Sequence, residues 1–143
     1  MENDSNWIYN QSGVIAFRYE QNELEILLIT SRHRQRWIIP KGIIEHGFSP
    51  ADSAKNEAFE EAGIEGLVFP NPIGKYQFHK WGGEVTVLVF LFEVTRVNEE
   101  WPESSFRKRK WVGIEEAIKL VDLEGLREII QNLPLHLNRM KNS

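Results

Sequence analysis

The sequence predicts a layered domain in which a β-sheet is covered by a few helices, an α/β or α+β arrangement. Three observations support this fold class: two aliphatic segments of strand length near the N-terminus, one sharply delimited helix at 50–62, and a long hairpin at 76–97. A chain of 143 residues is long enough to bury a core of this kind. We therefore expect a single domain over residues 1–143.

The first two strands are predicted at 14–19 and 24–30. The second is almost entirely aliphatic, which is typical of a central strand that is covered on both faces. The polar segment 20–23 between them favours a hairpin. A short extended piece at 37–40 then leads into a glycine-containing loop.

The clearest helix is predicted at 50–62, because its start and its end both carry specific signals. Ser49 is a suitable N-cap, Pro50 fits the first helical position, and Gly63 fits the C-terminal stop. Small apolar side chains at helical spacing form a thin stripe that would let this helix approach a sheet closely. They are Ala51, Ala54, Ala58 and Ala62.

The second half of the chain predicts a hairpin, a further strand and two helices. They are strands at 76–81 and 85–97 paired across Gly82–Gly83, a strand at 108–112, and helices at 114–121 and 126–133. Pro134 is expected to end the last helix. The first few residues and residues 140–143 are expected to be frayed ends.

The composition argues against several classes of protein. Without cysteine the chain forms no disulfides, zinc–thiolate sites or iron–sulfur clusters. A net charge of −4 argues against a general nucleic-acid binder, and no apolar run approaches the ~18 residues of a membrane span. The polar start is not typical of a signal peptide. We therefore expect a cytoplasmic protein that binds neither nucleic acid nor membranes.

Three carboxylates crowd one side of the predicted helix, those of Glu57, Glu60 and Glu61. At about 100° per residue they project within an arc of roughly 100°. Their mutual repulsion and their position in the C-terminal half of the helix are unfavourable unless a cation neutralises them. Ligation by oxygen alone points to Mg²⁺ or Mn²⁺, whereas the alternative is a solvated acidic surface.

Basic residues flank this helix in the sequence. One cluster contains Arg32, Arg34 and Arg36, and the other runs through residues 107–110. Acidic groups for a metal, together with basic groups for an anion, are what metal-assisted phosphoryl transfer needs. Local basic clusters on an acidic chain favour a defined anionic ligand over a long polyanion.

The segment 42–64 resembles the Nudix box, which reads Gly, five residues, Glu, seven residues, Arg-Glu-apolar-any-Glu-Glu-any-Gly-apolar. The matching positions are Gly42, Glu57, Ala58, Glu60, Glu61, Gly63 and Ile64. Segments 31–40 and 107–119 resemble the diphosphoinositol polyphosphate phosphohydrolase branch of that family, which also hydrolyses diadenosine polyphosphates. The resemblance implies a Nudix-type α/β/α sandwich, with a mixed β-sheet between helices.

The resemblance also implies roles for the residues of the box. In the family, the glutamates that match Glu57, Glu60 and Glu61 bind Mg²⁺, and one of them acts as general base. We assign Glu60 as the base, with Glu57 and Glu61 as firm ligands, so Glu57 and Glu60 are the candidate catalytic residues. The backbone carbonyl of Lys41 is a further candidate metal ligand. One more ligand could come from Glu84, Glu93 or Glu103, and the sequence does not choose among them.

Cations near the box are candidates for binding the phosphate groups of a substrate, because arginine favours bidentate phosphate contacts. They are Arg32, Arg36, Lys41, Arg107 and Arg109. The last two alternate on a predicted strand and would share a face. For each arginine the alternative is a surface ion pair of little energetic value. Trp81, beside two glycines, is a candidate for stacking on a base.

Two positions depart from the box. Phe48 stands where the first box glutamate belongs, and Asn56 stands where the arginine belongs. Phenylalanine cannot replace a carboxylate and asparagine supplies no charge. Turnover is therefore expected to be reduced unless another group compensates, and Glu45 in the same loop is a candidate.

These observations predict a metal-dependent Nudix pyrophosphohydrolase that cleaves a phosphoanhydride bond in a dinucleoside polyphosphate or a diphosphoinositol polyphosphate. Few cations occur at 10–11 and 81–83, which makes the highly charged inositol substrate less secure. The alternatives are an ADP-ribose or sugar-nucleotide pyrophosphatase, and a ligand-binding module of the same fold that has lost catalysis. The expected partner is a small-molecule polyphosphate. Nudix proteins often dimerise, so a homodimer also stays open.

Overall fold

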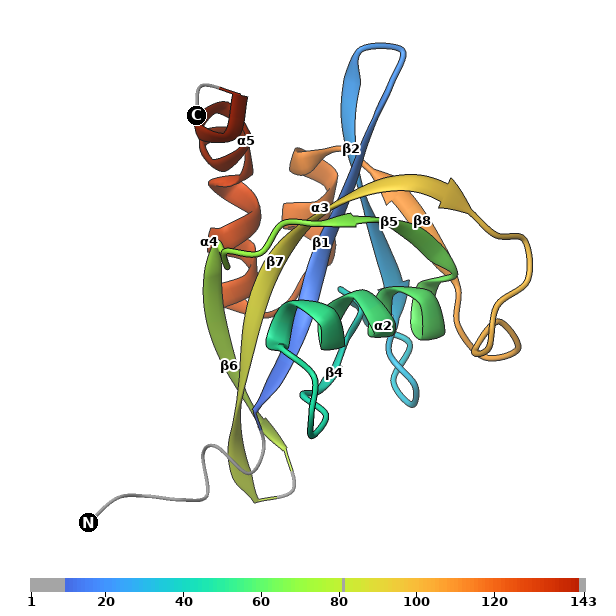
Figure 1. The fold of residues 1–143 in the computed structure, drawn as a ribbon, viewed down its shortest axis with the longest axis vertical. Coiled ribbons are helices and arrows are strands. Elements are labelled where there is room, and N and C mark those ends of the chain that lie inside the picture. The colour runs from blue at the N-terminus through green and yellow to red at the C-terminus, as the bar shows by residue number, and fades with distance from the viewer. Residues whose placement is uncertain (1–9, 81, 142–143) are drawn as a thin grey trace.

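The computed structural model describes residues 10–80 and 82–141. The strands are β1 (Gln11–Glu20), β2 (Glu23–Thr30), β3 (Trp37–Ile38), β4 (Lys41–Ile43), β5 (Ile64–Val68), β6 (Gly74–Lys80), β7 (Gly83–Val97) and β8 (Arg109–Val112). The helices are α2 (Pro50–Ala62), α3 (Ile114–Leu120), α4 (Glu124–Gln131) and α5 (Leu133–Lys141). All these strands belong to one mixed sheet (Figure 1).

The sheet is organised around the parallel pair β1 and β7. Their register runs from Gln11 opposite Val87 to Phe17 opposite Glu93. The path β3-β2-β1-β7-β5 continues outward from this pair, and β8 joins β2, β4 joins β1 and β6 joins β7, all antiparallel. β4 therefore lies beside the N-terminal end of β1, where Gly42 is opposite Ser12.

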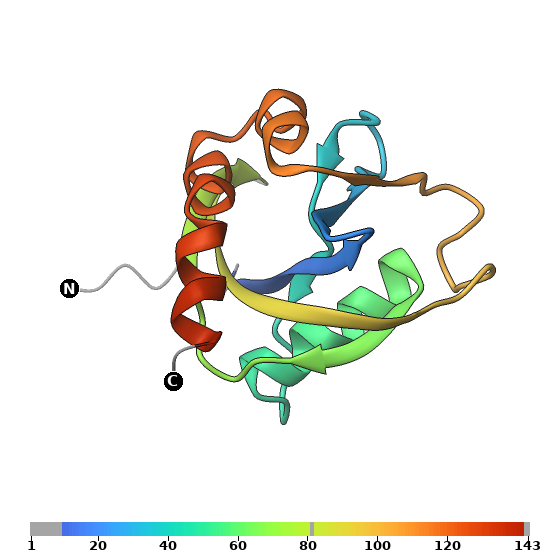
Figure 2. The same cartoon turned by 90° about the horizontal axis from the view of Figure 1, so that it is seen from above.

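Helix α2 covers one face of this sheet (Figures 1 and 2). Ala54, Ala58 and Ala62 are fully buried against Val14, Phe90 and neighbouring strand residues. The small alanine side chains allow the helix to lie close to the strands, as the alanine spacing predicts. This close approach brings the carboxylates of α2 next to the backbone of β4.

The other face carries α3, α4 and α5, which Figure 2 shows grouped on the side of the sheet opposite α2. Leu126 and Ile130 of α4 are fully buried there, together with Ile15 and Leu28 of the sheet. Helices on both faces of a mixed sheet make an α+β sandwich, so the predicted fold class is confirmed.

Some elements differ from the sequence-based prediction. β4 was expected to be loop and β5 was not expected, because both are short and β5 contains a bulge at Glu65 and Gly66. Pro134 does not end the helical region: it lies in the first turn of α5, where a missing N–H costs no helical hydrogen bond. Residues 140–141 are accordingly helical rather than frayed. The expected frayed start lies outside the described residues.

None of the described helices combines the length and the apolar character that crossing a membrane requires.

Candidate active site

The ends of α2 are fixed by the local signals that the sequence contains. The Ser49 hydroxyl accepts a hydrogen bond from the Asp52 N–H at 3.1 Å, and Pro50 occupies the first turn. Gly63 adopts a left-handed conformation with φ of 68° and donates to the carbonyls of Ala58 and Phe59. With these ends fixed, the three candidate carboxylates differ in exposure: Glu60 is exposed, Glu57 is half-buried and Glu61 is buried.

Glu61 is held by donors from two other parts of the chain. Its Oε1 accepts a hydrogen bond from the backbone N–H of Lys41 at 3.1 Å. Its Oε2 lies 3.2 Å from the Nη2 of Arg107. A carboxylate that is 8% exposed needs such partners, because burying an unpaired charge is strongly unfavourable.

Glu57 lies directly against the backbone of β4. A Cβ atom placed on Gly42 would fall 2.3 Å from the carboxyl carbon of Glu57. Glycine at this position therefore leaves the space that the carboxylate occupies, which gives the first glycine of the box a physical role.

Burial and neighbouring charge raise the pKa of both carboxyl groups. The pKa of Glu57 rises from 4.5 to about 7, mainly through burial and then through the nearby charges of Glu61, Glu103, Glu45 and Glu60. The pKa of Glu61 also rises to about 7 through burial, although Arg107 and the Lys41 N–H oppose the rise. A nearby cation would stabilise the ionised form of these carboxyl groups, which burial disfavours.

Segment 98–109, which consists of the β7–β8 connection and the first residue of β8, surrounds the C-terminal end of α2. The indole N–H of Trp101 donates to the Glu61 carbonyl at 2.9 Å, and the Glu103 N–H donates to the Glu60 carbonyl at 3.2 Å. Arg109 donates to the Ala62 carbonyl at 2.7 Å and lies 3.8 Å above the ring of Trp101. These contacts satisfy the last carbonyls of α2 and fix the position of the carboxylates.

Of the three candidates for an additional ligand, the structure brings Glu103 to the cluster. Its Oε1 lies 2.8 Å from the Nε of Arg107, and its charge contributes to the raised pKa of Glu57. Glu84 is opposite His79 in the β6–β7 hairpin, and Glu93 is exposed on β7 opposite Phe17. Neither is among the main charges that shift the pKa of Glu57 or Glu61.

The donor set fits Mg²⁺ or Mn²⁺. Carboxylates and a backbone carbonyl are the oxygen ligands that these ions prefer, and Gly42 leaves room for Glu57 beside β4. Over residues 10–80 and 82–141, no three His, Cys, Asp or Glu side chains converge into a complete metal site. This is compatible with Mg²⁺, which proteins bind through one or two carboxylates while substrate phosphates and water fill the other positions.

A hollow of about 540 Å³ lies on the side of the sheet that carries α3 and α4, and Lys41, whose N–H binds Glu61, is one of its lining residues. Segment 31–38, the end of β6 and the α3–α4 connection form its walls. Its cationic and histidine side chains are Arg32, His33, Arg34, Arg36, Lys41, His79 and Lys80. Its apolar side chains are Trp37, Ile38, Phe78, Val121, Leu123 and Leu126.

Lys41 joins the hollow to the carboxylates. Its backbone N–H binds Glu61, whereas its ammonium group reaches the hollow, 4.5 Å above the ring of Phe78 and 3.3 Å from the side-chain oxygen of Gln11. Burial lowers the pKa of Lys41 from 10.5 to about 8, although Glu61 opposes this. An anion beside the ammonium group would therefore stabilise its charged form.

The five cations predicted to bind phosphate fall into two groups. Arg32 and Arg36 line the hollow with Lys41; Arg36 also lies 3.5 Å from Asp122 across its rim. Arg107 lies before β8 and so does not alternate with Arg109 on a strand as expected; both contact the C-terminal end of α2 rather than the hollow. Their proposed contacts with phosphate stay a prediction. Trp81 lies outside the described residues.

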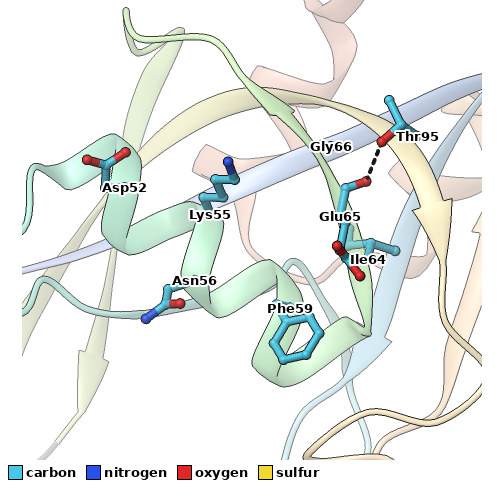
Figure 3. Close-up of a pocket in the computed structure, with 8 residues that line it drawn as sticks. All are labelled: Asp52, Lys55, Asn56, Phe59, Ile64, Glu65, Gly66 and Thr95. Carbon is cyan, nitrogen blue, oxygen red and sulfur yellow. Dashed lines mark hydrogen bonds between the residues drawn. The ribbon is translucent and has the colours of Figure 1, made fainter.

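The two departures from the box lie at exposed positions. Phe48 is 45% exposed in the loop before α2. Asn56 lines a different hollow of about 580 Å³ on the flank of α2 (Figure 3). That hollow contains none of the three box carboxylates of α2. Glu45, the candidate substitute, is near enough to Glu57 to raise its pKa.

Sequence reasoning missed several residues of the site. Phe78 and Leu123 line the hollow, and Trp101 binds the Glu61 carbonyl. Phe78 lies two residues after the buried Tyr76 on β6, so its side chain could have been inferred to point to the same face of the sheet. No local signal identifies Leu123 or Trp101, because both act through contacts distant in sequence.

Comparison with known proteins identifies the family of this chain. The model of the NUDIX domain family matches residues 9–133. The chain therefore belongs to the Nudix family, and the resemblance seen in the segment 42–64 is confirmed.

Particular relatives carry the comparison further. Nudix hydrolase 21, chloroplastic, of Arabidopsis thaliana is 34% identical over 127 residues, which are 83% of this chain and 63% of the relative. Diphosphoinositol polyphosphate phosphohydrolase 2 of Rattus norvegicus is 31% identical over 119 residues, 78% of this chain and 62% of the relative. The chain thus spans about three fifths of the length of these curated relatives.

Solved structures share the fold. An Ap4A hydrolase of C. elegans superimposes with a TM-score of 0.76 and 21% identity, covering 91% of this chain and 98% of that one. The NUDIX domain of Shewanella oneidensis NrtR, solved with ADP ribose, gives a TM-score of 0.71 and 13% identity, covering 90% and 87%. At these identities the likeness concerns the fold alone.

The raised pKa values predict how stability depends on pH and metal. Because the folded protein raises the pKa of Glu57 and Glu61 from 4.5 to about 7, their contribution to stability is fully present below about pH 4.5 and is lost as the pH rises through 7. A divalent cation binds the ionised carboxylates, so Mg²⁺ should raise the melting temperature more at pH 8 than at pH 5. Differential scanning calorimetry at both pH values tests this. Equal shifts at the two pH values would contradict it, and Glu57→Gln should reduce the shift at pH 8.

Gly42→Ala is expected to damage the site without unfolding the protein. The new Cβ would meet the end of the Glu57 side chain, which can turn away, so the free energy of unfolding should change by less than about 1 kcal/mol. Stabilisation by Mg²⁺ at pH 8 should be largely lost. Gly113→Ala is the matched control, because its added Cβ meets no atom within 4 Å. Undiminished Mg²⁺ stabilisation in Gly42→Ala would show that metal binding does not require the Glu57 carboxylate to lie against Gly42.

Proposed function

We propose that this protein is a metal-dependent pyrophosphohydrolase that cleaves a phosphoanhydride bond of a dinucleoside polyphosphate. The observation that carries the proposal is that Lys41 contacts both parts of the site. Its backbone N–H binds Glu61, and its side chain lines the hollow. A polyphosphate chain held by Lys41 would therefore have one phosphate beside the carboxylates and the rest of the ligand in the hollow.

The chemistry follows from the roles that the side chains can take. When bound, Mg²⁺ or Mn²⁺ would neutralise charge on the phosphate oxygens and favour attack by water on phosphorus. Glu57 and Glu61, fixed by Gly42 and the Lys41 N–H, would hold the cation. Glu60 is exposed on the same helix and would accept the proton of the attacking water. Lys41 and Arg32 would bind the phosphates that leave.

The lining of the hollow favours a nucleotide over an inositol pyrophosphate. An inositol ring that carries phosphates on all sides presents charge in every direction, whereas six of the fifteen residues that line the hollow are apolar or aromatic. Trp37 and Phe78 are half-buried and offer ring surface to a base.

The activity assay also distinguishes the alternative functions. Relatives are named as diphosphoinositol polyphosphate phosphohydrolases, and a structural neighbour was solved with ADP ribose, so both ligand classes belong in the assay. Phe48 and Asn56 motivate the remaining alternative, a binding module without turnover. We propose that the protein is cytoplasmic. A homodimer is the oligomeric state that we consider beside a monomer.

The proposal is tested by phosphate release from diadenosine polyphosphates, an inositol pyrophosphate, ADP-ribose and nucleoside triphosphates, with Mg²⁺ and with Mn²⁺. We expect the highest kcat/KM with a diadenosine polyphosphate. Glu60→Gln should lower kcat by about 10²-fold or more, because it removes the general base.

The control for this assay is Glu23→Gln, which changes an exposed glutamate in the β1–β2 hairpin and should retain full activity. A preference for the inositol pyrophosphate would overturn the substrate assignment. Tight binding of a ligand without product formation would instead identify the binding module.

Phe78→Leu tests the base-binding surface. Loss of the ring should raise KM for a diadenosine polyphosphate by about 5-fold or more, because stacking of one base contributes ~1–3 kcal/mol. KM for inorganic tripolyphosphate should hardly change. Phe69→Leu is the matched control, since Phe69 packs against the same core but does not line the hollow. Equal effects on both substrates would argue against a base in this position.

A further inference from the structure

Arg107 is enclosed by protein partners. Its side chain is only 7% exposed, and each of its three guanidinium nitrogens has a partner. Nε lies 2.8 Å from Oε1 of Glu103, Nη1 donates to the Thr30 carbonyl at 2.8 Å, and Nη2 lies 3.2 Å from Oε2 of Glu61. Such a planar group, held at three corners, has one fixed orientation.

This orientation directs the guanidinium toward the carboxylates and not toward the ligand hollow. Lys41, Arg32 and Arg36 line the hollow, whereas Arg107 is not among its described lining residues. A phosphate-binding arginine needs free N–H groups that face the substrate. The contacts of Arg107 are instead those of a group that orients another side chain.

Helix α2 does not supply a positive charge for its own carboxylates. It has no basic residue in its last turn, where Glu60 and Glu61 lie. Its lysine, Lys55, lines the hollow on the flank of the helix together with Asn56, as Figure 3 shows. The compensating cation for the buried Glu61 therefore comes from outside the helix.

We propose that Arg107 is a positioning residue that holds the Glu61 carboxylate in the orientation needed to bind a divalent cation, and so supplies from segment 98–109 the positive charge that α2 lacks. This inference rests on the proposed function. Arg107 and the Lys41 N–H each bind one oxygen of Glu61, which leaves further lone pairs on both oxygens for a metal. Partners of metal ligands in such positions act by fixing the ligand.

The rest of segment 98–109 fixes the position of Arg107 relative to α2. The Glu103 N–H binds the Glu60 carbonyl, and the Glu103 carboxylate binds Arg107, so a single residue ties the guanidinium to the helix backbone. Thr30 binds both the guanidinium and the N–H of Lys108. Arg107 is thereby anchored to β2 on one side and to α2 on the other.

The test compares Arg107→Gln and Arg107→Lys with the intact protein, by titration calorimetry with Mn²⁺ alone and by steady-state kinetics. We expect Arg107→Gln to weaken Mn²⁺ binding by about 10- to 100-fold and to lower kcat by a similar factor, with KM changed by less than about 3-fold. Arg107→Lys should retain part of the Mn²⁺ affinity, because it keeps the charge but not the three-way contact. Arg18→Gln, which removes an ion pair with Glu25 in the β1–β2 hairpin, should leave Mn²⁺ binding unchanged.

Other results would overturn the inference. A raised KM with unchanged kcat and Mn²⁺ affinity would make Arg107 a phosphate-binding residue, and equal or tighter Mn²⁺ binding by a folded Arg107→Gln would exclude the positioning role. If Arg107→Gln does not fold, undiminished Mn²⁺ affinity in Arg107→Lys would have the same meaning. Intact protein that binds Mn²⁺ but turns over no substrate would contradict the proposed function alone, because the Mn²⁺ comparison needs no turnover. Absence of Mn²⁺ binding by intact protein would overturn the inference itself.

Discussion

The burial of the Glu61 carboxylate is the constraint on which the arrangement of the site depends. A charge in this position, between α2 and β4, is stable only when donors reach it from other elements. The Lys41 N–H of β4 and Arg107 of segment 98–109 provide them. Segments from both sides of α2 in the sequence therefore meet at one residue. The contacts of Trp101 and Arg109 with the last carbonyls of α2 complete the same junction.

The second requirement is that the carboxylates and the ligand hollow meet, although α2 and α3–α5 cover opposite faces of the sheet. Strand β4 connects the two parts of the site. Gly42 lies against Glu57 on the α2 side, and the neighbouring Lys41 extends its side chain to Phe78 on the other. Because adjacent residues of a strand point to opposite faces, two consecutive residues can serve both parts of the site. The charge of the carboxylates and the charge of the hollow are thus opposite and adjacent, as binding of a metal–polyphosphate complex requires.

Local signals allowed much of the fold to be predicted. Caps at Ser49 and Gly63 and the alanine stripe defined α2 to the residue, and the aliphatic run at 24–30 defined most of β2. β4 and β5 were missed because short strands acquire their conformation from pairing with β1 and β7 rather than from their own composition. Pro134 was misread because proline is equally suited to following one helix and to starting the next.

For the site, the sequence by itself determined the chemical class. The spacing of Glu57, Glu60 and Glu61 on one helix follows from helical geometry alone, and Gly42 and the flanking cations complete a pattern that indicates metal-assisted phosphate chemistry. Only the tertiary structure decided which cations face a ligand and which face the carboxylates. Arg32 and Arg107 look alike in sequence, but one lines the hollow and the other is buried against Glu61. The physical reason is that burial and pairing depend on segments distant in the chain, which no local pattern encodes.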